Sequence, residues 1–384
     1  MSSSPRAIRV LVATTCHPPQ DARIRFREIE ALVDAGMKVT YAAPFKDMDS
    51  KTVPGLINFD VPGALAGRET RVSAAYHACL RIAAIAKHHD AVIIHDPDLL
   101  PALGLIRAMN PLGDGPALIW DVHEDVPAQV DMLSLPSMVA APLKQIIRGG
   151  EAVAERMFHL MLAEVAYQQR FRKTHPVVPN TTRVMKSPPK YMDGTNRVVY
   201  VGALTEARGL RTLIEVAKIA PDLVIDVAGN AKGDAEVRLQ EASQAFPNLV
   251  YHGFVPNDKA LSMLDGALCG LSLLTEQDNY KDAQPTKLLE YMAHGLPFVT
   301  TPNPASVDLA EESGAGFVVG FNDAPAVVEA CRQLLAKPEL RIEMGKTGHS
   351  FVATKYNWEI DGPKFAGVVR EWANHLGTPI GESN

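Results

Sequence analysis

The sequence predicts an α/β protein built from two doubly wound, Rossmann-like domains that face a central cleft. Short, continuous apolar runs rich in β-branched residues alternate with helical patterns, which is typical of parallel strands buried on both faces of a sheet. The alternation stops in a segment rich in Pro, Thr, Asn and Lys at residues 174–196, and then starts again. A length of 384 residues suits two such domains better than one.

The first domain is expected over residues 1–185. Apolar runs predict its strands, and an amphipathic pattern that stops at Gly36 predicts its first helix. The expected strands cover residues 9–15, 39–43, 91–95 and 117–122, and the helix covers residues 24–35. Residues 137–162 predict an amphipathic helix pair that packs on the core, with contact to a membrane surface as the alternative.

The second domain is expected over residues 186–356. Its predicted strands cover residues 198–201, 223–228, 249–252, 268–274, 298–300 and 317–319, with helices between them as at 212–219 and 288–293. A third segment, residues 357–384, holds a last helix near 358–375 that follows the completed second sheet. We expect this helix to pack back on the first domain.

The composition narrows the class of protein. With 38 Lys and Arg against 44 Asp and Glu, the net charge is −6, which argues against nucleic acid as a partner. The four cysteines are scattered without a CxxC pair, as in reduced cytosolic proteins. No apolar run reaches the ~18 residues that a bilayer requires. We expect a cytoplasmic protein, with contact at the inner face of the membrane and the oligomeric state left open.

Residues 282–297 (DAQPTKLLEYMAHGLP) carry the strongest local signal. Pro285 and Gly295 predict the two ends of a short helix that begins near Thr286. The free N–H groups and the dipole at the start of such a helix form a seat for a diphosphate. Glu290 lies one turn further on the same face, where a carboxylate suits a ribose diol; a solvent-exposed glutamate is the alternative.

Residues 200–210 (YVGALTEARGL) run from a predicted strand into a loop. Gly202 allows a ligand to approach the backbone closely, and Arg208 offers five N–H donors to phosphate oxygens. Taken alone, this stretch also fits a plain strand-to-helix loop with an exposed arginine.

These stretches occur together with further motifs in one order along the chain. The order is VGALTEARG, VAG, YHGFVP, a D-x7-E element that leads into GLPFVTT, and GAGF. It resembles the nucleotide-sugar-binding domain of a GT-B glycosyltransferase of family 4 over residues 198–320, and more weakly over 7–130. The resemblance implies retaining, metal-independent transfer of a sugar from a nucleoside diphosphate to a hydroxyl of a saccharide, lipid-linked or small-molecule acceptor. It implies no cofactor, and UDP is the most frequent nucleotide of the donors in the family.

The resemblance also implies roles for individual residues. Asp282 would contact the donor sugar as a catalytic residue, Glu290 would anchor the ribose, and Arg208 with the helix start at Thr286 would hold the diphosphate. The remaining donor-binding residues are expected to be Gly202, Gly253, Phe254, Val255, Ala283, Gln284, Lys287 and Leu288.

The chain departs from the family pattern at three places. Asp282 replaces the usual glutamate, the pair Gln284–Pro285 replaces an aromatic residue and a glycine, and Ala203 stands where many members carry an arginine. Lys287 lies in the first turn of the predicted helix. It either supplies the missing cation or is a solvated helix residue, and the sequence favours neither interpretation.

Two polar stretches follow predicted strands in the first domain. His17, Asp21 and Arg23 belong to HPPQDARIRFRE, which resembles the HPxxDxRI variant of the family loop. These residues are expected to meet the acceptor or the diphosphate; a capped helix start with exposed arginines is the alternative. His123 follows a strand where family members carry a histidine that meets the transferred sugar, so we expect a catalytic role. An ordinary loop histidine, or an imidazole bonded to Asp121, is the alternative.

His95 and Asp96 end a further predicted strand and are expected on the acceptor side. The histidines and acidic residues of the chain show no recognised spacing of metal ligands, so we expect no metal site.

Three other functions remain to be weighed. An epimerase or hydrolase of the same architecture would act on the nucleotide-sugar without an acceptor. A binding subunit that has lost catalysis fits the departures at Ala203 and Gln284–Pro285. A nicotinamide dehydrogenase is disfavoured, because no GxGxxG follows either first strand.

Overall fold

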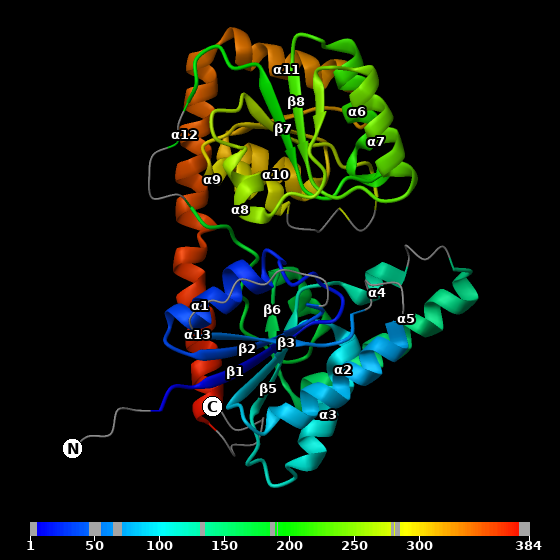
Figure 1. The fold of residues 1–384 in the computed structure, drawn as a ribbon, viewed down its shortest axis with the longest axis vertical. Helices are drawn as coiled ribbons and strands as arrows, with labels where there is room; N and C mark the ends of the chain where they lie inside the picture. Colours follow the sequence, from blue (N-terminus) through cyan, green and yellow to red (C-terminus); the bar gives the residue numbers. More distant parts are fainter. Residues whose placement is uncertain are drawn as a thin grey trace, which may run out of the picture. The chain divides into compact units, whose positions relative to one another are not determined.

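The computed structural model describes residues 6–45, 55–63, 71–130, 135–184, 189, 191–277, 280 and 285–375. The chain divides into two compact units (Figure 1). Unit 1 comprises Met1–Asn180 and Ile360–Asn384, and unit 2 comprises Thr181–Glu359. Within the described residues each unit holds a six-stranded sheet, and its strands pair in parallel. The predicted α/β fold class is therefore confirmed.

The sheet of unit 1 has the strand order β3-β2-β1-β4-β5-β6. Its strands are β1 (Arg9–Ala13), β2 (Lys38–Ala43), β3 (Leu56–Asp60), β4 (Ala91–Ile94), β5 (Ala117–Val122) and β6 (His159–Leu162). Val12 in β1 lies between Tyr41 of β2 and Ile93 of β4. The chain adds strands β2 and β3 on one side of β1 and strands β4, β5 and β6 on the other side. The loops after β1 and β4 therefore border the crevice where open α/β sheets bind ligands.

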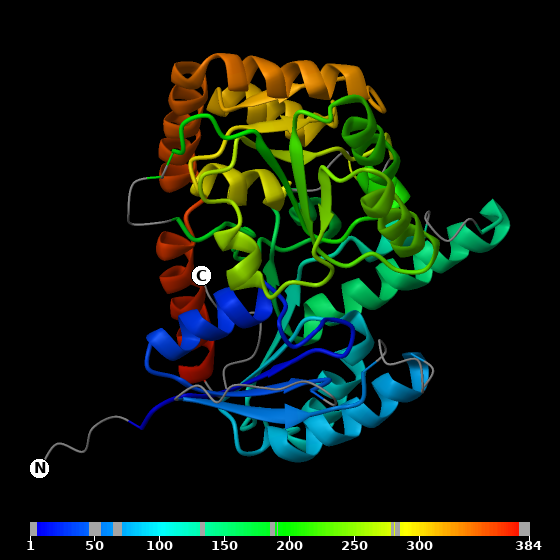
Figure 2. The same ribbon diagram turned by 45° about the horizontal axis from the view of Figure 1, so that its top comes forward.

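Helices cover both faces of this sheet. They are the π-helix η1 (Ile24–Ile29), α1 (Glu30–Asp34), α2 (Arg71–Ala86), η3 (Pro97–Leu99), α3 (Leu100–Met109), α4 (Val126–Gln129), α5 (Ser137–Met157), η5 (Val165–Arg170) and α13 (Trp358–Asn374). An apolar cluster that includes Leu11, Ile82 and Leu103 buries α2 and α3 on one face. Figure 2 shows α1 and α13 on the other face. Arg370 of α13 donates a hydrogen bond to Ala35 O there, at 2.7 Å.

Unit 2 repeats the same topology, with the order β12-β11-β10-β7-β8-β9. Its strands are β7 (Arg197–Val201), β8 (Val224–Ala228), β9 (Leu249–Tyr251), β10 (Cys269–Ser272), β11 (Phe298–Thr300) and β12 (Gly316–Val318). Here the chain adds β8 and β9 on one side of β7 and β10, β11 and β12 on the other side. The loop after β7 and the segment that leads from β10 into the next helix therefore border the corresponding crevice of this sheet.

The helices of unit 2 form two layers. They are η6 (Glu206–Arg208), α6 (Leu210–Ile219), α7 (Asp234–Ala245), α8 (Asn257–Ser262), α9 (Thr286–Ala293), α10 (Pro304–Ser313), α11 (Ala324–Ala336) and α12 (Pro338–Lys355). Side chains of α6, α7 and α11 share one apolar cluster with the sheet, and those of α8, α9, α10 and α12 share another. The position of α9 matters most for function, because its first turn reaches the crevice end of the sheet.

The structure differs from the sequence-based expectation in unit 1. The helix pair predicted over residues 137–162 is wrong, since α5 is a single helix and His159–Leu162 forms β6, in which Leu160 pairs with Trp120 of β5. The apolar run HLML follows a helical pattern directly, and periodicity does not separate a four-residue strand from the end of a helix. The edge strand β3 was also not expected from the sequence. Among the described residues, no helix combines the length and apolarity needed to cross a membrane.

Candidate active site

Three glycines end the neighbouring strands β7, β8 and β9 of unit 2. Gly202 donates its N–H to Ala228 O at 2.8 Å, and Gly229 donates to Gly253 O at 2.8 Å. A Cβ atom on Gly229 would lie 1.9 Å from Gly202 O. Because no side chain fits between these strands, bare backbone forms the surface at this end of the sheet.

Lys287 lies beside this backbone, in the first turn of α9. A Cβ atom on Gly202 would lie 3.3 Å from Lys287 Cε, and Nζ stands 3.8 Å from the centre of the Tyr200 ring. The side chain as a whole is half-buried, but its nitrogen is inaccessible to solvent and has no hydrogen-bond partner in the described part of the chain. A buried ammonium without a partner is energetically unfavourable, so this position suits an anionic ligand.

The electrostatics agree with that interpretation. Burial and, next in size, the positive charge of Arg208 lower the pKa of Lys287 to about 7, while the carboxylate of Glu290 acts in the opposite direction. Two cations and one carboxylate therefore lie at the start of α9. The solvated-residue interpretation of Lys287 does not hold, because its nitrogen is buried.

The other predicted donor-binding residues are distributed unevenly. Thr286 and Glu290 are half-buried on α9, Val255 packs against the apolar cluster beneath it, and Phe254 is exposed. The side chain of Leu288 lies in the core, and its backbone N–H already donates to Pro285 O at 2.9 Å. Neither the side chain nor the N–H is therefore free to bind a nucleotide-sugar. Asp282, Ala283 and Gln284 lie outside the described residues.

In unit 1 a network of ionisable side chains lies at the ends of β1, β4 and β5. Arg23 donates from Nε and Nη2 to the two carboxylate oxygens of Asp121, at 3.0 and 2.9 Å. Its Nε also lies 2.8 Å from Glu28 Oε1. The π-helix explains this second contact, because the N–H of Glu28 donates to Arg23 O and so brings residues five apart onto one face.

His95 occupies the middle of this network. Its Nδ1 lies 3.2 Å from Asp121 Oδ2 and its Nε2 lies 3.4 Å from Glu28 Oε2, with no exposed side-chain surface. Burial lowers the pKa of His95, and burial together with the Asp121 charge raises the pKa of Glu28 well above its usual value. For Asp121 the charge of Arg23 and the hydrogen bonds of the histidines outweigh burial, so its pKa lies well below the usual range.

Asp96 holds the loop after β1. Its Oδ2 accepts hydrogen bonds from the hydroxyl of Thr14 at 2.9 Å, the N–H of Thr15 at 2.5 Å and the N–H of Cys16 at 3.1 Å. Asp21 holds the end of the same loop by accepting from the N–H groups of Arg23 and Ile24, in the manner of a helix cap.

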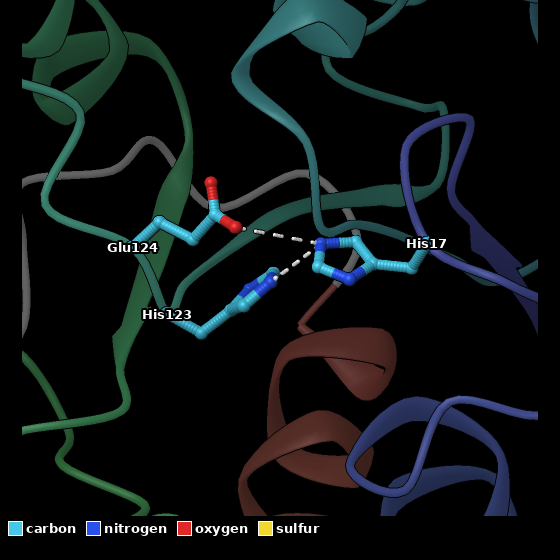
Figure 3. A group of neighbouring side chains, drawn as sticks. All are labelled: His17, His123 and Glu124. Atoms are coloured by element: carbon cyan, nitrogen blue, oxygen red, sulfur yellow. Dashed lines mark hydrogen bonds and ion pairs between the residues drawn. The ribbon is translucent and has the colours of Figure 1, made fainter. Parts of the chain in front are cut away.

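Three further side chains, His17, His123 and Glu124, lie next to one another beside this network (Figure 3). His17 Nε2 lies 3.0 Å from His123 Nε2 and 3.9 Å from Glu124 Oε1. The other ring nitrogen of His123 lies 3.4 Å from Asp121 Oδ2, which joins this group to the buried network. Burial lowers the pKa of His17, but the hydrogen bond and charge of Asp21 and the charges of Asp96 and Glu124 raise it above its usual value.

The structure changes the roles expected in this unit. Arg23, His95 and Asp96 are buried and bonded to other side chains, so they position the site rather than line an acceptor pocket. The predicted alternative of exposed arginines is wrong for Arg23, although the helix-cap function of Asp21 is present. His17 and His123 stay at the solvent side.

The sequence missed Glu28 and Glu124 as site residues, and it named Asp121 only as a bonding partner of His123. A signal for Glu28 exists, because it stands among the apolar residues Ile24, Ile29 and Leu32 that the helix buries. An acidic residue on an apolar face indicates a buried partner.

Comparison with solved structures identifies the fold. The fold matches sucrose-phosphate synthase from Thermosynechococcus elongatus with a TM-score of 0.72 at 15% identity, over 95% of this chain and 99% of that one. It also matches Anabaena Alr3699/HepE in complex with UDP-glucose, with a TM-score of 0.68 at 12% identity over 95% and 100% of the two chains. The chain therefore has the GT-B glycosyltransferase fold.

The family comparison concerns the second unit. Residues 184–351 match the model of the glycosyl transferases group 1 family. A putative colanic acid biosynthesis glycosyltransferase, WcaL of Escherichia coli (strain K12), is 29% identical over 154 residues, which are 38% of each chain. The curated relatives are aligned over 37–47% of their own lengths. The family resemblance expected from the sequence motifs is thus confirmed.

Proposed function

We propose that this protein is a retaining glycosyltransferase that moves a sugar from a nucleoside diphosphate to an acceptor hydroxyl. The observation that carries the proposal is the buried ammonium of Lys287, which lies without a hydrogen-bond partner in the described residues, beside the bare backbone at Gly202. A diphosphate supplies the negative charge that this group needs, and α9 adds the free N–H groups of its first turn.

In this proposal Lys287, Arg208 and the start of α9 stabilise the diphosphate as it leaves, and diphosphate departure then needs no metal ion. Preorganised cations of this kind act on charge that develops in the transition state. Glu290 binds the ribose and the backbone around Gly253 meets the base. A UDP-sugar is the expected donor, in keeping with the UDP-glucose complex of HepE.

His123 of unit 1 is proposed to meet the transferred sugar, and the acceptor is a saccharide, a lipid-linked saccharide or a small alcohol. The WcaL relative, named for colanic acid biosynthesis, favours a saccharide among these. We place the reaction in the cytoplasm.

The first experiment is a thermal-shift series with UDP, GDP, ADP, TDP and NAD, with and without magnesium. Stabilisation by one nucleoside diphosphate without magnesium supports the proposal and identifies the base. Stabilisation by NAD alone would overturn it. Turnover is then measured as nucleotide release with and without acceptor sugars. Release that does not depend on an acceptor would indicate a hydrolase, and binding without release would indicate a subunit that has lost catalysis.

Lys287→Met separates binding from folding. Methionine replaces a buried, unpartnered ammonium by an apolar side chain of similar length, so the free protein should melt at or above the wild-type temperature. Affinity for the nucleoside diphosphate should fall at least about tenfold, since a charge-assisted contact of ~1.5–3 kcal/mol is removed. Lys218→Met is the control, because Lys218 is exposed on α6 and pairs with Glu215.

The ribose assignment has its own test. Glu290→Ala should raise the KM for the donor, and full transfer by this variant at low donor concentration would exclude Glu290 from donor binding. Retention is read from the anomeric configuration of the product by NMR.

A further inference from the structure

Two histidine rings of unit 1, those of His17 and His123, face each other through their Nε2 atoms. His17 Nε2 and His123 Nε2 lie 3.0 Å apart. His123 Nδ1 lies 3.3 Å from the carbonyl oxygen of Asp121 and 3.4 Å from its carboxylate, and both of these groups only accept. His17 Nδ1 lies 3.7 Å from Asp21 Oδ2. Both rings therefore have an oxygen acceptor near Nδ1, and a neutral ring that donates from Nδ1 presents a lone pair at Nε2.

Oxygen acceptors surround the same point. Glu124 Oε1 lies 3.9 Å from His17 Nε2, and Asp96 Oδ1 lies 3.4 Å from it. Two ring nitrogens and two carboxylate oxygens therefore converge on one point. A shared proton joins one pair of atoms, whereas a divalent ion is held by several ligand atoms at once.

We propose that His17, His123 and Glu124 bind a divalent cation of the zinc class. Their ligand atoms all lie within 4.8 Å of one another (Figure 3). In a tetrahedral zinc site with bonds of about 2.0–2.1 Å, ligand atoms are roughly 3.3 Å apart, so small side-chain movements close this site around an ion. Two histidines and one glutamate form a known zinc ligand set that leaves a fourth position for a water or hydroxyl oxygen.

The surroundings have the features of a metal site. A carboxylate stands behind each imidazole, Asp21 behind His17 and Asp121 behind His123, and such carboxylates orient histidine ligands and increase their basicity. Solvent reaches the site, since the Glu124 side chain is 37% exposed and that of His17 is 19% exposed.

A neighbouring set, His95, Asp121 and His123, also has suitable spacing. It is the weaker candidate, because the guanidinium of Arg23 already pairs with both oxygens of Asp121. The cation is therefore assigned to the outer set. The ion differs from the expectation of no metal drawn from the sequence, and one of its ligands is His123, the residue also proposed to meet the transferred sugar.

Metal binding to the purified full chain tests the proposal without donor or acceptor. The protein is stripped with a chelator, loaded with Zn²⁺ and analysed for bound metal by mass spectrometry. Co²⁺ then reports the geometry through its visible absorption. We expect one zinc per chain and a strong tetrahedral Co²⁺ spectrum. A folded wild-type chain that retains no stoichiometric zinc would overturn the site and leave a shared proton between the histidines.

Variants locate the ion. Glu124→Gln and His17→Gln should each weaken zinc binding more than Asp21→Asn does. Asp21→Asn keeps an oxygen for the helix cap and removes the charge behind His17, and a 10–100-fold loss is expected for it. His252→Gln is the control, because it removes a histidine–carboxylate pair from unit 2. Melting curves of the zinc-free proteins check folding, and Glu124 is the safest position because it is the most exposed of the three. Equal zinc binding by wild type, Glu124→Gln and His17→Gln would contradict the assignment.

Discussion

The crevice ends of the two sheets share a topology and differ in how their charges are compensated. In unit 1 Arg23 and Glu28 of the η1 segment meet Asp121 and His95 of the strand ends, and these side chains pair with one another in the interior. In unit 2 the strand ends carry glycines, and the nearest buried charge, Lys287, has no hydrogen-bond partner in the described residues.

This difference separates two uses of the same fold. A charge that is paired within the protein fixes the positions of its neighbours, while a charge that lacks a partner is available to a ligand. We therefore expect substitutions in the unit 1 network to act mainly on stability. Substitutions around Lys287 should act mainly on binding.

The largest expected effect is the loss of stability in Arg23→Met. The substitution leaves the Asp121 carboxylate buried without its cation and removes the contact to Glu28, and breaking a buried ion pair from one side costs about 3–5 kcal/mol. Scanning calorimetry should show one thermal transition moving to lower temperature. A second transition, from unit 2, should stay unchanged.

The control for this prediction is Arg332→Met. Arg332 also forms a two-point pair, with Asp222, but both partners lie at the surface of unit 2. Solvent compensates exposed charges, so this variant should melt much like the wild type. Comparable destabilisation by both variants would remove the distinction between the two kinds of pair.

The next effect concerns the glycine surface of unit 2. Gly229→Ala places a methyl group 1.9 Å from Gly202 O, and the backbone must move, so we expect a loss of roughly 2–4 kcal/mol. Gly253→Ala is the matched variant, because φ is +66° there and the added atom meets nothing within 4 Å. Its expected loss is about 1–2 kcal/mol, from backbone conformation alone. Urea unfolding measures both, and equal losses would show that the close approach at Gly229 is relieved.

The sequence predicts the elements better than it predicts the contacts. Local signals suffice for α9, because Pro285 and Gly295 mark its two ends and the structure has the helix over Thr286–Ala293. They do not suffice for Lys287, whose burial depends on Tyr200 and Gly202 of another strand end. Burial set by distant residues leaves no mark in the local pattern.

The same limit applies in unit 1. Arg23 and Glu28 are five residues apart, and residues five apart fall on different faces of an α-helix, so their pairing depends on the π-helix. His95 and Asp96 mark a strand end correctly, but the sequence does not distinguish a side chain that lines a site from one buried behind it.

The smallest expected effect is the dependence of nucleotide affinity on pH. The pKa of Lys287 is lowered to about 7 by burial and by Arg208, with Glu290 opposing, and the ring beneath it belongs to Tyr200, whose pKa is raised by burial. Below pH 7 the amine is charged and binds the diphosphate. Above pH 7 the free protein loses this charge, so the Kd should rise by up to about tenfold per pH unit until the pKa of the complex is reached.

Lys287→Arg distinguishes the lysine from the rest of the site. A guanidinium stays charged across this range, so the Kd of this variant should be nearly constant from pH 7 to 9. The terminal phosphate of the nucleotide, with a pKa of about 6, is fully ionised there and adds no slope. Titration calorimetry in buffers of different ionisation enthalpy also counts protons, and the wild type should take up a proton on binding above pH 7. If both proteins show the same slope, another group carries the dependence, and Lys287 is not the cation that the diphosphate meets.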